Sequence, residues 1–423
     1  MNVLVIGSGG REHAIVKALK KNTGIRKLYA APGNGGISQD AQCLNIKADN
    51  ISGITDFVVE CNINYIIVAP DNPLAIGLVD ALEKRGKKCF GPNKAAARIE
   101  SSKVFSKNLM KKYGIPTAAY EVFSNSNDAN AYINSLGAKF PMVIKADGLA
   151  LGKGVFIAEN KTDALQAIEL LMVEKKYGDS GLNVVIEEFL TGHEVSVLAF
   201  TDGKTIKPMI SSMDHKKALD GNKGPNTGGM GAIAPNPHYT QEIAELCERT
   251  IFKPTIMAMQ SEGCPFKGCL YFGLMLTSRG PVVIEYNSRF GDPEAQAVLP
   301  LLETDLLEIM TAVSDGKLDS IDIKWSNKHS ACVVLASGGY PESYKTGFEV
   351  TPLDADGSLK FSDAIIYHAG TMWDGSKFQT SGGRVINCTA TGATLSDALK
   401  NAYSAASQIT FQGIYYRKDI GKY

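Results

Sequence analysis

The sequence lacks a net charge, and it lacks any long apolar run. Lysine plus arginine and aspartate plus glutamate number 44 each among the 423 residues, so the formal net charge is zero. A balanced chain has no overall field that would hold nucleic acid or an anionic membrane. We therefore expect no nucleic-acid partner and no membrane partner, and any phosphate must bind at local sites. The first residues enter a strand-like run without a basic segment or an apolar stretch of signal length, which predicts a cytoplasmic protein.

Paired metal ligands and activated nucleophiles are missing as well. None of the eight cysteines belongs to a Cys-x-x-Cys pair, and the nearest two, Cys264 and Cys269, have no second pair that would complete a zinc site. We expect free thiols in a reducing cytosol. The six histidines show no spacing typical of zinc ligands, and no serine or cysteine lies in a nucleophile elbow. The sequence therefore predicts neither a zinc site nor a covalent catalyst.

The apolar pattern changes along the chain. A length of 423 residues suggests about three domains. Residues 1–100 alternate between short apolar strands and helices, one of them at 73–84, which predicts a parallel sheet with ligands at the carboxyl ends of its strands. Later strands form hairpins, an α+β pattern that continues into a β-rich C-terminal part. The expected fold class is therefore multidomain, α/β followed by α+β. The Pro- and Gly-rich segment 219–238 is expected to be a long loop.

A glycine-rich turn follows the first expected strand at residues 7–13, GSGGREH. Such a turn points backbone N–H groups and the positive end of a helix at one spot, which suits a phosphate. A dinucleotide fingerprint would need a third glycine at Glu12 and an acid near the end of the second strand, where residues 30–32 are AAP. These departures disfavour NAD. Because Arg11 adds a charged partner, we favour a phosphate site over a turn that only serves helix packing.

A second glycine-rich segment, KADGLALGKG at 145–154, lies between two expected strands. It differs from a Walker A loop, because three residues separate Gly148 from Gly152, and Gly154 stands where serine or threonine is needed. One interpretation is a movable flap over nucleotide phosphates, with one lysine before the loop and one within it. The other is a flexible turn with solvated lysines, and the pattern supports both equally.

Two acids end another apolar strand. Glu187 and Glu188 close the run that begins at Val184, and Glu194 follows after a short gap. The backbone at such a strand end can bind an adenine edge, and a nearby carboxylate can hold ribose hydroxyls. The alternative is that these acids are simply solvated, as acids at strand ends usually are.

Polar side chains also alternate at the end of a later strand. Glu285 and Asn287 are two residues apart, so on a strand their side chains share a face. Hard oxygen ligands at this spacing suit Mg²⁺ bound together with substrate phosphates. Arg289 and Asp292 leave the strand toward the same place. The alternative for Glu285 is an ordinary surface acid, which its position at the end of an apolar strand disfavours.

These pieces, in this order, resemble the ATP-grasp ligases and, more closely, the family of phosphoribosylamine–glycine ligases, also called glycinamide ribonucleotide synthetases. The resemblance runs from residue 2 to the C-terminus, and several of its motifs are too long for chance agreement. The matching segments are GGREHA at 9–14, PGN at 32–34, KADGLA at 145–150, GKG at 152–154, GPNTGGMG at 224–231, NSRFGDPE at 287–294 and GGRV at 382–385.

The resemblance implies a fold and a reaction. It implies an N-terminal domain over 1–100, an ATP-grasp central domain over 101–120 and 188–326, a lid over 121–187 and a C-terminal domain over 327–423. The implied reaction joins glycine to 5-phosphoribosylamine with ATP, through a glycyl phosphate, in purine synthesis. The expected partners are these small molecules with Mg²⁺ or Mn²⁺. We expect a single-function form without fused enzymes, and a monomer.

The resemblance also assigns roles residue by residue. The implied catalytic residues are Arg289, Lys153 and Asp292. The implied metal ligands are Glu285 and Asn287. The implied nucleotide-binding residues are Lys103, Lys145, Gly152, Lys153, Gly154, Glu187, Glu188, Leu190 and Glu194. The implied substrate residues are Gly9, Gly10, Arg11, Glu12, Asn34, Asp71, Asp214, Lys216, Asn226, Thr227, Gly228 and Gly229.

Two positions depart from the family pattern. Residues 69–74 are APDNPL where the family often has GPEAPL, so Asp71 keeps the charge but shortens its reach. Residues 271–275, YFGLM, lack the acid that many ATP-grasp enzymes carry there. Two alternatives stay open. Another ATP-grasp ligase or a carboxylase of purine synthesis would share the nucleotide half but not the GGREH loop. An inert nucleotide-binding regulator would be favoured by loss of Glu285, Asn287 or Lys153, all of which are present.

Overall fold

The N-terminal residues form a five-stranded parallel sheet in the order β3-β2-β1-β4-β5, in a computed structural model that describes residues 1–135, 138–149, 154–360 and 362–422. Every residue of β1 is buried, as expected where helices cover both faces of a parallel sheet. This confirms the predicted parallel α/β start. The strands are β1 Asn2–Gly7, β2 Lys27–Pro32, β3 Gln42–Cys43, β4 Tyr65–Val68 and β5 Lys88–Phe90. The helices are α1 Gly10–Leu19, α2 Ile37–Asp40, α3 Ile51–Glu60, α4 Asp71–Ile76 and α5 Leu78–Glu83.

The single helix predicted over 73–84 is wrong in one respect, because it is two helices. Gly77 separates α4 from α5 and has φ +95°, a left-handed conformation that ends a helix. The apolar pattern continues across the break, so the sequence periodicity hides it.

An antiparallel sheet in the order β11-β10-β16-β17 forms the centre of the molecule. Its strands are β10 His193–Asp202, β11 Ile206–Pro208, β16 Lys267–Thr277 and β17 Gly280–Asn287. The helices of this region are α6 Lys94–Ser101, α7 Lys103–Tyr113, α10 Gln241–Cys247, α11 Lys253–Ser261, α12 Glu294–Val298 and α13 Leu306–Asp315. The shorter turns are η3 Glu248–Phe252, η4 Leu299–Leu301 and η5 Leu318–Ser320.

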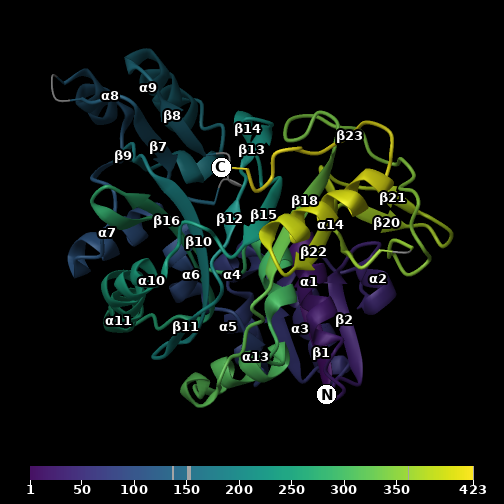
Figure 1. The fold of residues 1–423 in the computed structure, drawn as a ribbon. Coiled ribbons are helices and arrows are strands. Elements are labelled where there is room, and N and C mark those ends of the chain that lie inside the picture. Colours follow the sequence, from purple (N-terminus) through teal and green to yellow (C-terminus); the bar gives the residue numbers. More distant parts are fainter. Residues whose placement is uncertain (136–137, 150–153, 361, 423) are drawn as a thin grey trace.

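A smaller sheet projects from the body at the upper left of Figure 1. Its strand order is β6-β9-β7-β8, and it has its own apolar core, which includes Ile144, Ile168 and Ile186. Its strands are β6 Tyr120–Phe123, β7 Met142–Ala146, β8 Val155–Ala158 and β9 Val184–Glu188. Its helices are α8 Ser126–Asn134, α9 Lys161–Ile168, η1 Glu169–Val173 and η2 Gly178–Gly181.

A last sheet combines strands from residues 213–234 with strands from the C-terminal part of the chain. Its order is β12-β15-β18-β22-β19, with β23 paired to β18. Its strands are β12 Met213–Asp214, β15 Gly231–Ala234, β18 His329–Ser337, β19 Ile365–His368, β22 Arg384–Gly392 and β23 Ile414–Tyr415. Two hairpins and a helix surround it: β13 Lys217–Leu219 with β14 Lys223–Asn226, β20 Thr371–Trp373 with β21 Phe378–Thr380, and α14 Leu395–Gln408.

The predicted long loop at 219–238 is therefore wrong in part. It contains β14, and it contains β15, whose four residues are all buried between β12 and β18. The partner β18 begins at His329, about a hundred residues further along the chain. A strand of four residues flanked by Gly and Pro gives no periodic signal of its own, and only this distant pairing makes it a strand.

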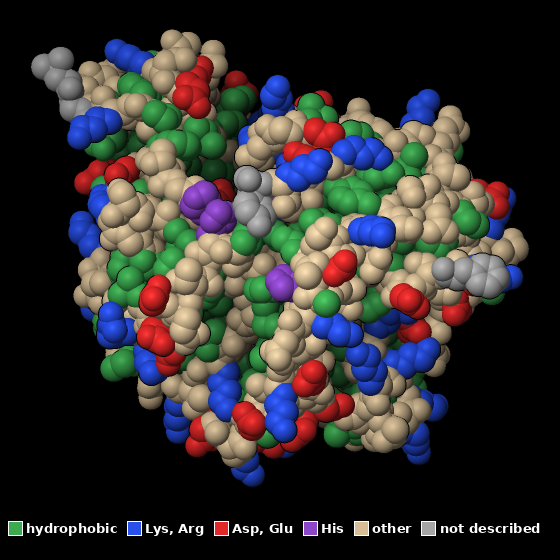
Figure 2. Space-filling model, in the orientation of Figure 1, with side chains coloured by type: hydrophobic (Ala, Val, Ile, Leu, Met, Phe, Trp, Pro, Cys, Tyr) green, Lys and Arg blue, Asp and Glu red, His purple; other side chains and the backbone are tan. Residues whose placement is uncertain are grey.

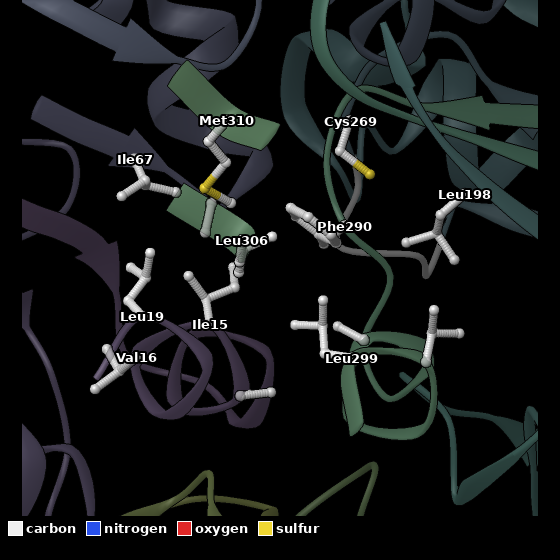
Figure 3. Close-up of a cluster of buried hydrophobic side chains, with 14 of the residues drawn as sticks. Ile15, Val16, Leu19, Ile67, Leu198, Cys269, Phe290, Leu299, Leu306 and Met310 are labelled. Atoms are coloured by element: carbon white, nitrogen blue, oxygen red, sulfur yellow. The ribbon is translucent and has the colours of Figure 1, made fainter. Parts of the chain in front are cut away.

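A buried apolar cluster joins the N-terminal sheet to the central sheet. Figure 3 shows Ile15 and Leu19 of α1 on one side, Leu198 and Cys269 of the central strands on the other, and Phe290 between them. Phe290 is 1% exposed. Because this ring is anchored in the shared core, the turn that follows β17 is held against both parts of the molecule.

Three buried histidines lie where distant segments meet. His13 Nδ1 accepts the backbone N–H of His368 at 2.8 Å, and its Nε2 faces Asp40 at 3.1 Å. His368 Nε2 faces the Gly357 carbonyl at 2.9 Å. His215 Nε2 accepts the N–H of Gly421 at 3.0 Å. Burial lowers the pKa of His13, and it lowers the pKa of His215 to about 4 and that of His368 to about 3. These rings fold as neutral imidazoles.

Acid should therefore weaken the fold. The unfolded chain binds protons at these rings below a pKa of about 6.5, whereas folded His215 and His368 stay neutral down to about 4 and 3. Between these values the unfolded state holds more protons, so stability falls as pH falls, by up to about 1.4 kcal/mol per pH unit for each ring. Urea unfolding at pH 7 and pH 5 measures this, and His215→Gln should reduce the difference. Tyr65→Phe is the control, since it should lower stability equally at both pH values; an unchanged difference in His215→Gln would contradict the assignment.

None of the helices in the described ranges is long and apolar enough to cross a membrane. On the face shown in Figure 2, lysine and arginine side chains are interspersed with aspartate and glutamate side chains over most of the surface. This mixture matches the equal numbers of the two kinds of charge in the sequence.

Candidate active site

The first glycine loop lies at the carboxyl end of β1, in the middle of the N-terminal sheet. Gly9 N–H donates to Glu12 Oε2 at 2.6 Å in a capping box that opens α1. A Cβ on Gly10 would lie 2.5 Å from Asn387 Nδ2 and 2.6 Å from Gln296 Nε2. Only glycine lets the start of α1 come this close to β22 and α12. The first turn of a helix offers N–H groups without intrahelical partners, which suit a phosphate.

Arg11 and Asn34 are placed by contacts with other parts of the chain. Arg11 Nε pairs with Glu12 Oε1 at 2.6 Å, and its Nη1 donates to the Phe290 carbonyl at 3.1 Å, so the guanidinium reaches the turn after β17. Asn34 donates from Nδ2 to the carbonyls of Ser8 and His368, each at 2.8 Å. Gly9, Arg11, Glu12 and Asn34 thus lie together at the carboxyl ends of β1 and β2.

A buried ion triad lies at the base of the projecting sheet. Glu187 Oε2 is 3.1 Å from Lys145 Nζ and 3.0 Å from Lys107 Nζ, and all three side chains are almost fully buried. Lys145 Nζ also donates to the Ile284 carbonyl at 3.2 Å, one residue before Glu285. Burial lowers the pKa of Lys107 to about 8. Glu187 therefore fixes the position of Lys145, while Lys145 itself reaches the end of β17.

The start of α7 is tied to the segment that was interpreted as a flap. Lys103 Nζ donates to the Gly148 carbonyl at 3.2 Å, and Asp147 Oδ1 accepts from Ser102 Oγ at 2.9 Å and from Val104 N–H at 2.8 Å. Burial lowers the pKa of Lys103. Lys103 therefore lies beside the base of the segment.

Of five other predicted nucleotide-binding residues, two lie outside the described residues and three take no part in the buried triad. Gly152 and Lys153 lie outside the described residues. The carbonyl of Gly154 accepts the Ala146 N–H at 2.8 Å and closes the hairpin of β7 and β8. Glu188 lies at the surface and pairs with Arg279 at 2.9 Å. Leu190 is partly exposed, in the connection between β9 and β10.

Glu285 and Asn287 lie on one face of β17, with Tyr286 buried on the other. Lys216 Nζ is 3.3 Å from Glu194 Oε2 and 3.9 Å from Glu285 Oε1. The surroundings of Glu285 disfavour its charge, but Lys216, Lys145 and Lys103 outweigh this and lower its pKa. An ionised carboxylate and an amide oxygen that are both partly accessible fit a hard divalent cation.

No cluster of three or more His, Cys, Asp or Glu side chains suited to a metal occurs in the described part of the chain. Any cation here would need phosphate and water oxygens to complete its ligands, which is usual for Mg²⁺.

Asp292 connects the turn after β17 to the C-terminal sheet. Its Oδ1 accepts Gln296 Nε2 at 2.7 Å and pairs with Arg384 Nη1 at 3.2 Å. Burial disfavours the charge of Asp292, but Arg384 and Arg11 outweigh it and lower the pKa. Arg384 Nη1 also donates to the carbonyls of Gly228 at 2.5 Å and Asp292 at 2.9 Å.

The segment 214–231 lies against the same turn. A Cβ on Gly229 would lie 2.3 Å from Pro293 and 2.6 Å from Asp214 Oδ1. Thr227 N–H donates to the Lys216 carbonyl at 2.8 Å, which folds the hairpin of β13 and β14 back on itself. Asn226 at its end is exposed. Gly229 and Asp214 are therefore brought to the Asp292–Pro293 turn, while Lys216 faces Glu285, although the sequence separates these segments by more than sixty positions.

Sequence reasoning missed five residues that hold this site together: Glu100, Lys107, Gln296, Arg384 and Asn387. Four have no motif signal. Arg384 lies in GGRV at 382–385, a segment noted for its resemblance but given no role. Glu100, Lys107, Arg384 and Asn387 act through contacts with residues that are distant in sequence, so only the fold shows them, whereas Gln296 reaches Asp292 one helical turn away.

Family models match the chain in three consecutive parts. The models are described as phosphoribosylglycinamide synthetase, N domain, over residues 1–100; ATP-grasp (A) domain, over 101–295; and C domain, over 330–423. A curated phosphoribosylamine–glycine ligase of Caldanaerobacter subterraneus is 47% identical over 420 residues, which is 99% of each chain.

Two solved structures resemble the fold at different levels of identity. A phosphoribosylamine–glycine ligase of Thermotoga maritima superposes with a TM-score of 0.84 at 33% identity, covering 99% of this chain and all of the other. The biotin carboxylase domain of a Hydrogenobacter thermophilus 2-oxoglutarate carboxylase, in complex with MgADP, ADP and bicarbonate, gives a TM-score of 0.74 at 15% identity over 98% of this chain and 91% of its own. The second likeness shows the ATP-grasp architecture alone.

Proposed function

We propose that this chain, which belongs to the phosphoribosylglycinamide synthetase family, carries out its ATP-dependent ligation of glycine to 5-phosphoribosylamine around the turn at 287–292. The observation that supports this location is a convergence. The Gly9–Arg11 loop, the Lys145 triad and the segment 214–231 come from different parts of the chain, and all of them contact this turn or the end of β17.

We propose two chemical steps. A carboxylate oxygen of glycine attacks the γ-phosphorus of ATP, and the bond to the β,γ-bridging oxygen breaks, with ADP as the leaving group that stays bound. The amine of phosphoribosylamine then attacks the acyl carbon of glycyl phosphate, phosphate leaves, and the amine loses a proton. Both steps need positioning and charge stabilisation rather than a protein nucleophile.

The residues divide between the two halves of this reaction. We assign Gly9, Gly10 and Arg11 to the 5-phosphate of phosphoribosylamine, because a glycine turn at a helix start suits an anion. We assign Lys103 and Lys145 to the phosphates of ATP, and Arg289 to the transferring phosphoryl group. The segments 214–216 and 226–229 are assigned to glycine and the γ-phosphate, since Gly229 packs on the Asp292–Pro293 turn. Asp292 is assigned to the positioning of this turn between Arg384 and Gln296.

A divalent cation, Mg²⁺ or Mn²⁺, fits Glu285 and Asn287. When bound, such an ion neutralises the charge that develops on the phosphate oxygens. The chain's own contribution is an ionised carboxylate that Lys216, Lys145 and Lys103 hold in that state, and an amide oxygen on the same face. Glu285 and Asn287 would hold the ion that orients the phosphates, and neither side chain needs to move a proton.

We further propose that residues 121–187 act as a lid, that the enzyme works as a monomer, and that it works in the cytoplasm. The lid has its own core and projects from the body (Figure 1). The proposal of a monomer is supported by the large exposed apolar residues, such as Val173, Met257 and Met372, which come from separate elements. The eight cysteines are free thiols, and six of them are buried, which suits a reducing compartment.

The proposed intermediate makes a specific isotope prediction. With ATP and glycine but without phosphoribosylamine, label in the β,γ-bridge of ATP should scramble into the β-nonbridging positions, because glycyl phosphate forms reversibly while ADP stays bound. ADP release in the same assay should require all three substrates. Absence of scrambling when the β-phosphate is free to rotate would favour a concerted path. Turnover without glycine would overturn the proposed function.

A further inference from the structure

Glu100 is a buried carboxylate at the end of α6, three residues before Lys103, and no motif includes it. Its Oε2 accepts the backbone N–H of Ser288 at 2.8 Å and the Ser288 hydroxyl at 2.7 Å. Its Oε1 lies 3.3 Å from Arg289 Nη2, and its side chain is 6% exposed. The two oxygens therefore bind two consecutive residues of the turn that follows β17: Ser288 through its backbone and hydroxyl, and Arg289 through its guanidinium.

Both terminal nitrogens of the Arg289 guanidinium have partners in the described part of the chain, but its Nε does not. Its Nη1 donates to the Phe290 carbonyl at 3.1 Å, and its Nη2 lies 3.4 Å from Asn287 Oδ1 as well as near Glu100. Its buried Nε has no hydrogen-bond partner among the residues that the structure describes. A guanidinium has five donors in a fixed plane, so fixing Nη1 and Nη2 also fixes where Nε points. A buried donor without an acceptor is costly unless an anion binds there.

The local charges match this arrangement. Glu100 Oε1 and Arg289 Nη2 form an ion pair at 3.3 Å, and their side chains are only 6% and 20% exposed. Burial raises the pKa of Glu100, while Arg289 acts in the opposite direction. The two side chains thus stabilise each other's charge, and each would be left uncompensated by loss of the other.

We propose that Glu100 is a positioning residue for the phosphoryl-transfer step: it fixes the plane of the Arg289 guanidinium, with Ser288 as the second anchor of the same carboxylate. The inference rests on the proposed role of Arg289 at the transferring phosphoryl group. Glu100 lies near the end of α6 and Lys103 begins α7. The short segment between these helices would therefore position two donors to ATP: Lys103 directly, and Arg289 through Glu100.

Glu100→Gln separates the two contacts of the carboxylate. The Ser288 N–H can only donate, so the oxygen of the new amide must face it and the Ser288 contact survives. The amide nitrogen then faces Arg289 Nη2, and two donors repel each other. The substitution therefore keeps the turn attached to α6 and releases the guanidinium.

The test is a double-mutant cycle in steady-state kinetics with Glu100→Gln, Arg289→Ala and the double variant. We expect Glu100→Gln to lower kcat by about a hundredfold, as a misplaced group does, with KM for ATP and for glycine changed less than about threefold. We expect no further loss when it is added to Arg289→Ala, because contacting residues are not additive. Tyr65→Phe, which removes a buried hydrogen bond to the Met310 carbonyl, controls for lost stability and should leave kcat unchanged.

The outcomes are distinct. Normal kcat in Glu100→Gln together with a low kcat in Arg289→Ala overturns the role of Glu100 and leaves the proposed function standing. Losses that multiply in the double variant also overturn it, because Glu100 would then act independently of Arg289. Normal kcat in Arg289→Ala overturns the proposed role of Arg289 itself, and the inference with it.

Discussion

Glu285→Ala should reduce turnover by more than about a hundredfold while the protein stays folded. Loss of an outer partner of a metal ligand already costs about ten- to a hundredfold, and Glu285 is assigned as a ligand itself. Its side chain is about one-third accessible, at 34%, so its removal leaves no buried cavity. The loss should appear in kcat with saturating ATP and Mg²⁺. Thermal unfolding monitored by circular dichroism should confirm an intact fold.

Two further variants test how the loss of activity depends on the charge of the lost ligand. Glu285→Gln keeps an oxygen donor and removes the charge, so its activity should lie between those of the wild-type chain and the alanine variant. Asn287→Ala should be milder than Glu285→Ala, because a neutral ligand contributes less to a cation. Electron paramagnetic resonance of Mn²⁺ with ATP should show weaker metal binding in Glu285→Ala. Near wild-type turnover of that variant would remove Glu285 from the site.

Local sequence patterns predicted the parts of the site that a single strand or turn creates. Glu285 and Asn287 share a face of β17 because strand side chains alternate, and this needs no knowledge of the rest of the fold. Gly9 and Asn34 follow β1 and β2, whose carboxyl ends meet at one edge of a parallel sheet. These placements follow from periodicity and topology, and both were readable in the sequence.

Contacts between distant segments were not readable. The sequence predicted Glu187 as a nucleotide-binding residue, with a solvated acid as the alternative, and the fold places it between Lys107 and Lys145 in a buried triad. Lys107 gives no signal, since a lysine within a helix is usually solvated. The same limit explains β15, which is a strand only because β12 and β18 lie beside it. A local pattern cannot report a partner that is distant in the sequence.

Arg11→Ala should raise the KM for phosphoribosylamine by about ten- to a hundredfold and leave the KM for ATP unchanged. Loss of one charge-assisted contact costs about 1.5–3 kcal/mol. The start of α1 should survive, because Gly9 N–H still donates to Glu12 Oε2 at 2.6 Å. Arg11→Lys keeps the charge and should give a smaller rise. Gly10→Val should raise the same KM and also destabilise the fold, since its Cβ would lie 2.5 Å from Asn387 Nδ2.

Lys145→Ala provides the opposite half of the test. It should raise the KM for ATP by a similar factor without changing that for phosphoribosylamine, because Lys145 is assigned to the nucleotide. The fold should tolerate the change, since Glu187 keeps its pair with Lys107 at 3.0 Å. If both sites bound one nucleotide, Arg11→Ala and Lys145→Ala would each raise the KM for ATP. Opposite selectivity of the two variants requires two phosphate sites, one on each side of the turn that Phe290 anchors.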